Sequence, residues 1–476
     1  MMMKHRQYFL LTFFFVLVST SLFSQYQVDF NDGNTGYYEA LCWYFDEASV
    51  SSSQPIEGNR SIRTSKLNNN IGIVISPWVL LTGSGTMTFK HRIYNFDGTR
   101  NLKVYLLSDA NPSGELILDY DYSNGTTQTE SIAISQSGLY QVKWRFSGSN
   151  GNSRGQLDEV SIPGTYASDP SNDCDPIDLN PDTDGDGVPD SEDDYPADPY
   201  RAYNNLYPAS GQATLAFEDL WPSGGDYDLN DVVVGYSFKI VTNGGDSVVD
   251  LIGTFVLRAS GAGLHNGFGF MLPAVSPTSI ISCTGYDVLS SAGYTFASNG
   301  LEDGQTHATI IVFDDFFRFL VPTGGGVGVN TSFGQTVVPW DTISITMAFM
   351  NNGTPGAGGP VSLTTLNIAA FNPFIVAGMV RGKEVHLPDY EPTDKADPTY
   401  FGIEDDDTNP ATGKYYKTAA NLPWALNIYE TFDYPLEEVS IVDAYLKFGD
   451  WVESNGIQYP DWYQDNQGYR NASNIY

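Results

Sequence analysis

Residues 26–165 alternate between apolar and polar positions in the manner of β-strands. Val142, Trp144 and Phe146, for example, fall on one face of such a strand. Turn-forming dipeptides such as Asn124-Gly125 separate the alternating runs, and no helical period stands out. The pattern predicts an antiparallel β-sandwich over residues 26–165.

A second region with the same character covers residues 201–476. Asn243-Gly244 separates two of its apolar runs as a hairpin turn would. Strands are expected at Val232–Phe238, Val248–Leu257, Ala308–Val312, Phe316–Val321 and Thr342–Met350. The C-terminal part is therefore predicted to be a β-rich domain.

One late segment has the period of a helix. Pro435 suits a helix start, acidic residues fill the first turn, and Asn455-Gly456 suits a stop. An apolar stripe at helical spacing is formed by Ile441, Ala444, Tyr445, Phe448 and Trp451. The pattern predicts a single amphipathic helix whose apolar face packs against the sheet.

The first 24 residues have the pattern of a secretory signal. Lys4 and Arg6 precede the apolar run Tyr8–Val18, and small polar residues follow, so cleavage is expected near Ser24-Gln25. We expect no lipid anchor, because no Cys stands just after the run, and no membrane span after signal removal. The mature chain is then expected in the periplasm, on the outer envelope surface or outside the cell.

Charge narrows the choice of partners. The 476 residues include 57 acidic and 23 basic ones, a net charge of −34. Such a chain repels phosphate backbones and anionic membrane surfaces, so a nucleic-acid partner is not expected. Metal cations are the expected counter-ions of so acidic a surface. Three cysteines are too few for a disulfide scaffold. Cys283 is expected to be a buried thiol, and the pairing of Cys42 and Cys174 is left open.

Residues 166–200 differ abruptly from both flanking regions. They contain twelve acidic residues, six prolines and no Lys or Arg. Prolines at this density prevent long helices, so the composition alone predicts a linker.

An aspartate ladder within this segment predicts a metal site. Its pattern is D-x-D-x-D-G-x-x-D-x-x-D, and Gly187 permits the sharp turn that lets the carboxylates converge. Calcium takes six to eight oxygen ligands of this kind. The predicted ligands are Asp182, Asp184, Asp186, the backbone carbonyl of Val188, Asp190 and Asp193. The loop resembles that of a thrombospondin type 3 repeat, with a dockerin half-repeat as a second choice; the alternative is a solvated acidic linker.

A second acidic cluster lies just before the strand expected at Val232. Alternating oxygens on an extended segment lie along one side, and the Gly224-Gly225 turn can bring the earlier acids back to them. The predicted ligands of a second calcium site are Glu218, Asp219, Asp226, Asp228, Asn230 and Asp231. The alternative is a turn capped by Asx side chains.

Two resemblances to known families follow from longer motifs. VDFNDGNTGYYEALCWYF, ISPWVLLTGSGTMTFKHRI and RGQLDEVSIPG resemble parts of the jelly-roll modules of bacterial adhesins and MAM-type domains. FEDLWPSGGDYDLNDVVVGYSF, GAGLHNGFGFMLP, EVHLPDYEPTD and LPWALNIYETFDYPLEEVSIVDAYLKFGDW resemble the LruC domain of exported bacterial proteins. The second resemblance implies a surface or envelope β-rich domain, often beside calcium loops, without an established catalytic role.

Catalytic motifs are weak in comparison. The histidines form no H-E-x-x-H pair, and no G-x-S-x-G elbow occurs. The sequence therefore predicts a non-catalytic, adhesin-like, ligand-binding or structural protein whose partner is a surface glycan or an extracellular protein. One alternative is a carbohydrate-binding protein that uses exposed Trp and Tyr of the N-terminal sandwich. Another is a hydrolase, for which Glu404 to Asp407 offers paired carboxylates.

Overall fold

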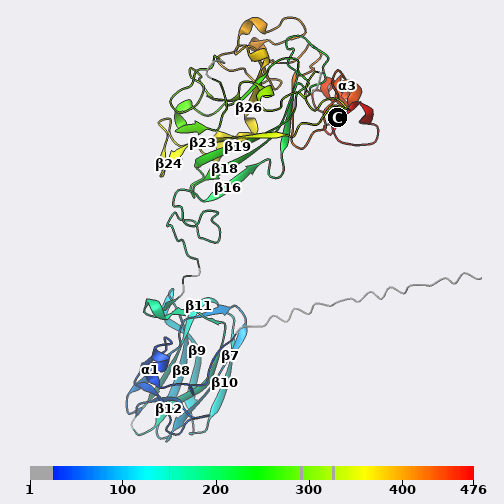
Figure 1. Cartoon of the computed structure of the whole chain (residues 1–476). Coiled ribbons are helices and arrows are strands. Elements are labelled where there is room, and N and C mark those ends of the chain that lie inside the picture. Colours follow the sequence, from blue (N-terminus) through cyan, green and yellow to red (C-terminus); the bar gives the residue numbers. More distant parts are fainter. Residues whose placement is uncertain (1–24, 150, 177, 179, 290–292, 324–326) are drawn as a thin grey trace, which may run out of the picture. The chain divides into compact units, whose positions relative to one another are not determined.

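The chain divides after residue 179 into two compact units. The computed structural model describes residues 25–149, 151–176, 178, 180–289, 293–323 and 327–476 (Figure 1). The predicted signal segment, residues 1–24, lies outside the described residues. The structure is mainly β, as predicted, and none of its described helices is long and apolar enough to cross a membrane.

The first unit is a sandwich of two antiparallel sheets. One sheet has the order β10-β7-β12-β4-β3, with β1 also on β12; its strands are β1 (Gln25–Val28), β3 (Ala48–Ser51), β4 (Ser61–Thr64), β7 (Gly85–Tyr94), β10 (Gln128–Ile134) and β12 (Arg154–Pro163). In the other sheet β11 is central; its strands are β2 (Tyr44–Asp46), β5 (Ile71–Ile75), β6 (Val79–Thr82), β8 (Arg100–Ser108), β9 (Asn111–Tyr122), β11 (Ser137–Gly148) and β13 (Thr165–Tyr166).

Alternation along the strands decides what lies between these sheets. Val142, Trp144 and Phe146 of β11 are all buried, as the sequence predicted, and Trp144 packs against Phe89 of the opposite sheet. Trp43 is also buried, so these two tryptophans belong to the core. Trp78 is half-buried and Tyr37 and Tyr44 are exposed, so carbohydrate binding by exposed Trp and Tyr of the sandwich stays a prediction.

A disulfide closes the first unit. Cys42 and Cys174 are bonded, with Cα atoms 5.4 Å apart and a separation of 132 residues in sequence. Cys42 follows the short helix α1 (Thr35–Glu39), and Cys174 lies between β14 (Ser168–Asp169) and β15 (Asp175–Pro176). The bond ties the end of the unit to its beginning, and it answers the question that the sequence left open.

The second unit has two facing antiparallel sheets. The larger has the order β21-β23-β19-β18-β17-β28, with β16 on β18; its strands are β16 (Tyr203–Tyr207), β17 (Ala213–Phe217), β18 (Val232–Thr242), β19 (Val248–Ala259), β21 (Ser282–Thr284), β23 (Asp341–Ala348) and β28 (Ala425–Ile428). The smaller has the order β22-β20-β26-β27 and contains β20 (Gly267–Leu272), β22 (Ala308–Phe313), β26 (Asn372–Val376) and β27 (Glu384–His386). A separate hairpin pairs β24 (Met350–Asn351) with β25 (Thr354–Pro355).

Aromatic side chains fill the space between the two sheets. Phe238 of β18 contacts Phe270 of β20, and Phe255 of β19 contacts Phe268, with ring centroids 5.8 and 5.3 Å apart. The predicted turn at Asn243 joins β18 to β19, because its side chain accepts hydrogen bonds from the backbone of Gly245 and Ser247. Cys283 is a buried free thiol, as predicted.

Two local predictions were wrong. Phe316–Arg318 is a short 3-10 helix, where a strand was expected. The predicted late helix is two short ones, α3 (Ile441–Ala444) and α4 (Phe448–Glu453), because Tyr445 is extended and pairs with Arg470. The apolar face was predicted correctly, since four of its five residues are buried, and the stop at Asn455-Gly456 is confirmed. A further short helix, α2 (Leu363–Leu366), was not predicted.

Candidate metal centres

The aspartate ladder folds into a compact loop. Ligand atoms of Asp182, Asp184 and Asp186 all lie within 4.8 Å of one another. The Asp182 carboxylate accepts hydrogen bonds from the backbone N–H groups of Gly185 and Gly187, at 2.8 and 3.0 Å. Both glycines have positive φ, so the chain can curl around this carboxylate.

Three carboxylate oxygens in this loop are buried and find no hydrogen-bond donor among the described residues: Asp184 Oδ2, Asp186 Oδ2 and Asp193 Oδ2. Desolvation and the negative charges of Asp186, Asp193 and Asp182 raise the pKa of Asp184. Unpaired buried carboxylate oxygens cost free energy unless a cation or proton compensates them. The loop therefore has the electrostatics of a cation site.

The remaining predicted ligands of the loop have different surroundings. Both oxygens of Asp190 accept hydrogen bonds from Thr183, and these bonds lower the pKa of Asp190. Asp190 thus closes the loop across its two ends. Val188 is buried and its backbone N–H donates to Asp186 Oδ1; the role of its carbonyl as a ligand stays a prediction.

This loop is part of the second unit and docks on its larger sheet. The Asp194 N–H donates to the Ala202 carbonyl, and the Ala202 N–H donates to the carbonyl of Thr242 at the end of β18, both at 2.8 Å. A Cβ built on Gly244 would lie 2.9 Å from Val188 Cγ2, so the loop sits against the β18–β19 turn. An ion in the loop would therefore stabilise a segment already joined to the sheet.

The second predicted cluster, which we term the acid centre, comprises Glu218, Asp219, Asp226, Asp228, Asn230 and Asp231. Strand register brings its ends together: Phe217 of β17 pairs with Val232 of β18, so Glu218 and Asp231 face each other just beyond the paired strands. The Asp219 N–H donates to Asp231 Oδ2 at 2.7 Å, and this hydrogen bond joins the two chain segments just beyond the paired strands. Side chains twelve residues apart in the chain are thereby neighbours.

The carboxylates of the acid centre form two overlapping groups. Ligand atoms of Glu218, Asp219 and Asp231 lie within 4.8 Å of one another, and so do those of Glu218, Asp226 and Asp228. Of these five side chains only that of Asp226 is exposed. Two oxygens on opposite sides of a calcium ion bound at about 2.4 Å are about 4.8 Å apart, so each group fits around one ion.

Glu218 is the most unusual member of the acid centre. Its side chain is fully buried, yet neither carboxylate oxygen has a hydrogen-bond donor among the described residues. Asn230 Oδ1 is likewise buried and unpaired. Native structures rarely leave buried polar atoms unpaired, so these oxygens point to a ligand.

Electrostatics agree with the geometry. Burial, followed by the charges of Asp228, Asp226 and Asp219, raises the pKa of Glu218 to about 8. Burial and the charge of Asp226 raise that of Asp228 to about 8, and the pKa of Asp231 rises well above its ordinary value for similar reasons. Two carboxylates 4.8 Å apart repel by about 3.5 kcal/mol at an effective dielectric constant of 20. A divalent cation removes this repulsion directly.

The sequence did not predict one further member of this region. Glu437, from the segment before α3, approaches the acid centre, and its Oε2 accepts a hydrogen bond from Thr331 at 3.1 Å. The neighbouring Glu438 N–H donates to Asp228 Oδ2 at 3.0 Å. Burial raises the pKa of Glu437 to about 7. Only tertiary packing could reveal it, because more than 200 residues separate it from the other carboxylates.

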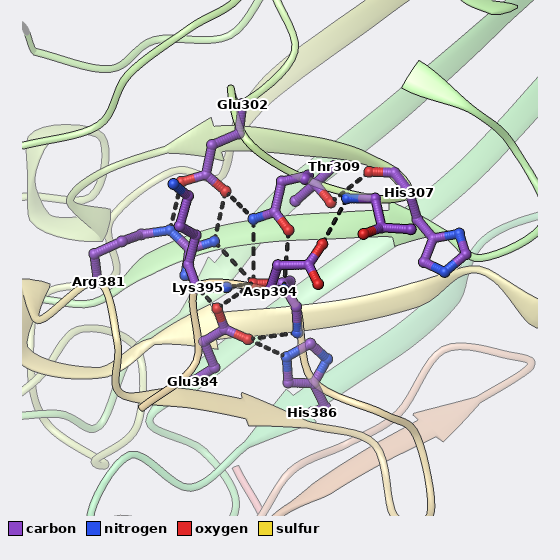
Figure 2. Close-up of polar contacts among 11 residues, drawn as sticks. Glu302, His307, Thr309, Arg381, Glu384, His386, Asp394 and Lys395 are labelled. Atoms are coloured by element: carbon purple, nitrogen blue, oxygen red, sulfur yellow. Dashed lines mark hydrogen bonds and ion pairs between the residues drawn. The ribbon is translucent and has the colours of Figure 1, made fainter. Parts of the chain in front are cut away.

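A second buried polar cluster in this unit has opposite properties. Figure 2 shows Arg381 between Glu302 and Glu384, with His386 on the other side of Glu384. Arg381 forms two hydrogen bonds to Glu302, and Glu384 accepts further bonds from His386 and Thr393. We term this set the Arg381 network.

In this network, ion pairs and hydrogen bonds reverse the effect of burial on the pKa of Glu384. Burial alone would raise the pKa of Glu384, but His386, Arg381 and Thr393 bring it down to about 2. Burial lowers the pKa of His386, whose Nδ1 contacts the Asn372 side chain at 2.7 Å. The buried carboxylates of the network are paired within it, and His386 is inaccessible to solvent.

Three of the four carboxylates proposed for a hydrolase, those of Asp405, Asp406 and Asp407, take part in contacts that hold loops in place. Asp406 is buried and accepts hydrogen bonds from Gly402 and Thr408 within its own loop. Asp405 accepts from the Gly224 N–H, and Asp407 pairs with Lys414. The acidic run is thus occupied in holding loops together.

Comparisons with known proteins give one family match. Residues 246–463 match the model of a domain of unknown function, DUF4842. The match begins after the acid-centre loop, includes Glu437 and covers most of the β-rich part of the second unit. The resemblance to LruC stays a prediction. No curated protein matches the chain.

Solved structures resemble the chain only distantly. A candidate lipoprotein from Bacteroides ovatus is 17% identical, with a TM-score of 0.42 over 90% of this chain and 98% of that one. The K1 cleaved adhesin domain of Lys-gingipain from Porphyromonas gingivalis is 16% identical, with a TM-score of 0.25 over 30% and 99%. The CBM22-1 xylan-binding domain from Paenibacillus barcinonensis is 13% identical, with a TM-score of 0.23 over 30% and 95%.

Proposed function

We propose that this protein is an exported, calcium-binding, non-catalytic protein of the cell surface or envelope, with a ligand-binding or structural role. The observation that carries the proposal is the Glu218 carboxylate, which is fully buried with neither oxygen hydrogen-bonded to a described residue. A group of this kind needs a cation or a proton.

The donor set favours calcium over other metals. The acid centre and the aspartate loop supply carboxylate and amide oxygens, without His or Cys among their close groups. Hard oxygen ligands of this kind suit calcium, whereas zinc and copper sites use nitrogen and sulfur. The net charge of −34 also raises the local concentration of cations.

Export is supported by the disulfide as well as by the N-terminal pattern. Disulfides form and persist mainly in oxidising compartments such as the periplasm and the cell exterior. The Cys42–Cys174 bond links two distant segments of the first unit, so it would be expected to persist in such a compartment. Free calcium is also abundant outside cells, where weak sites can be filled.

A binding role without catalysis accounts for the polar side chains of the second unit. His386 and Glu384 are buried and hydrogen-bonded, so they have no access to a substrate. In the acid centre, Asp226 alone of the clustered carboxylates is exposed. Oxygens arranged in this way hold an ion better than they attack a substrate.

A second candidate function, glycan binding by the first unit, is favoured by one cavity. A cavity of about 820 Å³ opens beside β1 and α1. Its lining combines aromatic rings with polar groups, a composition that suits sugars: Tyr26, Tyr37, Asp29, Asp32, Thr88 and Lys90. Binding of the chain to a glycan array, abolished by Tyr37→Ala, would support this function.

Isothermal titration of the metal-free full chain tests the main proposal. We expect calcium to bind with Kd values below 1 mM and magnesium to bind more weakly, since magnesium demands a stricter octahedral shell. The variant Glu218→Gln is expected to lose calcium at the acid centre. Absence of heat and of calcium retention up to several millimolar would refute the proposal.

A further inference from the structure

The acid centre has more ligand groups than one ion can use. Resting on the proposed calcium binding, we infer that it holds two calcium ions and that the Glu218 carboxylate bridges them. Glu218, Asp219 and Asp231 would hold one ion, and Glu218, Asp226 and Asp228 the other.

The grouping of the carboxylates is the first observation. Ligand atoms within 4.8 Å of one another form two triads rather than one set of five, and Glu218 is the member that both share. One calcium ion cannot bring all five side chains into a shell of about 2.3–2.6 Å radius unless the triads merge. Two ions fit the triads as they stand.

The state of Glu218 is the second observation, and it is independent of the grouping. Both oxygens of this fully buried side chain lack a donor among the described residues. A Cβ built on Gly225 would lie 2.5 Å from Glu218 Oε1, so this oxygen faces the turn that leads to Asp226. Oε2 is then left for the triad with Asp219 and Asp231. A carboxylate with two unpaired oxygens between two acidic triads has the arrangement of a bridging ligand.

Two further oxygens complete one side of the centre. A Cβ at Gly261 would collide with both Asn230 Oδ1 and Glu437 Oε2, so these oxygens converge on the space that this glycine leaves open. Asn230 Oδ1 is buried and unpaired. Asp228 accepts hydrogen bonds from the backbone N–H groups of Asn230 and of Glu438, the neighbour of Glu437, both at 3.0 Å. We therefore assign Asn230 and Glu437 to the ion held by Asp226 and Asp228.

Charge balance also favours two ions. Six carboxylates meet in this region: Glu218, Asp219, Asp226, Asp228, Asp231 and Glu437. When all are ionised, one calcium ion leaves a formal charge of −4 and two leave −2. Lys383, whose charge acts on Asp219, offsets part of the remainder.

Counting bound calcium in the full chain tests the bridge. Atomic emission after equilibrium dialysis in 1 mM calcium gives the number of ions per chain. We expect Asp219→Asn and Asp226→Asn to lose one ion each and Glu218→Gln to lose two. The control Asp303→Asn, which changes an exposed carboxylate of the same unit, is expected to lose none.

The counts separate the two levels of the proposal. A loss of one ion or none in Glu218→Gln, from a wild type that binds calcium at this centre, overturns the bridge and leaves calcium binding intact. A wild type that retains no calcium overturns both.

A second measurement does not depend on the folding of acid-centre variants. Terbium and europium replace calcium in oxygen sites, and energy passes between them only when they lie close together. In a chain with Asp184→Asn and Asp186→Asn, which disables the loop, we expect energy transfer from terbium to europium at mixed loading. Lanthanide binding without transfer overturns the paired-ion arrangement.

Discussion

Two buried carboxylates in the second unit show how partners decide the cost of burying charge. Glu218 and Glu384 are both fully buried. Glu384 accepts hydrogen bonds from Arg381, His386 and Thr393, and its pKa falls to about 2, whereas Glu218 has none of these partners and its pKa rises to about 8. The Arg381 network supplies its own positive charge, whereas the proposed calcium ions would supply that of the acid centre. The first should therefore be indifferent to calcium, and the second should depend on it.

Removal of calcium should have the largest effect. A site with Kd near 10 μM in 1 mM calcium stabilises the folded state by about 2.7 kcal/mol. Three such ions, two in the acid centre and one in the aspartate loop, together contribute about 8 kcal/mol. We expect hydrogen exchange in β17 and β18 to accelerate greatly in chelator. Magnesium at equal ionic strength serves as the control. Equal exchange with and without calcium would contradict the prediction.

Breaking the Arg381 network should have the next largest effect on stability. Arg381→Met leaves Glu302 and Glu384 buried without their cation, and the free energy of unfolding is expected to fall by about 3–5 kcal/mol. Urea unfolding should show the same loss with and without calcium. Lys447→Met, which removes a surface pair with Asp450, should cost much less. If the loss of unfolding free energy in Arg381→Met depended on calcium, the proposed difference between the Arg381 network and the acid centre would be wrong.

The Arg381 network also predicts a pH dependence. The pKa of Glu384 is about 2 in the folded chain and 4.5 for the free group, so its stabilisation is complete above pH 4.5 and is lost as pH falls through 2. The difference corresponds to about 3 kcal/mol. Glu384→Gln should remove this part of the acid destabilisation, measured by urea unfolding between pH 2 and 6. Exposed Glu453→Gln is the control, and parallel profiles for Glu384→Gln and the wild type would be inconsistent with the network.

The smallest effect is expected in the aspartate loop. Asp184→Asn with Asp186→Asn removes two of its three buried unpaired oxygens. In calcium we expect a local loss of up to about 2.7 kcal/mol, seen as protease cleavage or faster hydrogen exchange within residues 182–193. Exchange in β17 should stay unchanged, since the acid centre keeps its ligands. An equal loss of protection in the aspartate loop and in β17 would mean that the loop and the acid centre are coupled.

Much of the β architecture followed from local patterns. Strict alternation along β11 and the Asn243 turn between β18 and β19 depend on neighbours in the chain, and the structure confirms both. The late helix failed at Tyr445 because pairing with Arg470, 25 residues further on, outweighed helical periodicity. Local propensity is a weak prior where a distant backbone offers hydrogen bonds.

The sequence by itself determined which oxygens are candidates for calcium, because ligand spacing around Gly187 and along Asp226 to Asp231 is a property of a short stretch of chain. Only the tertiary structure decided that Glu218 is buried without a partner, that Glu384 is buried with one, and that Glu437 reaches the acid centre. The physical reason is that desolvation and charge pairing depend on every group within a few ångströms. Strand register and long loops, rather than sequence neighbours, bring those groups together.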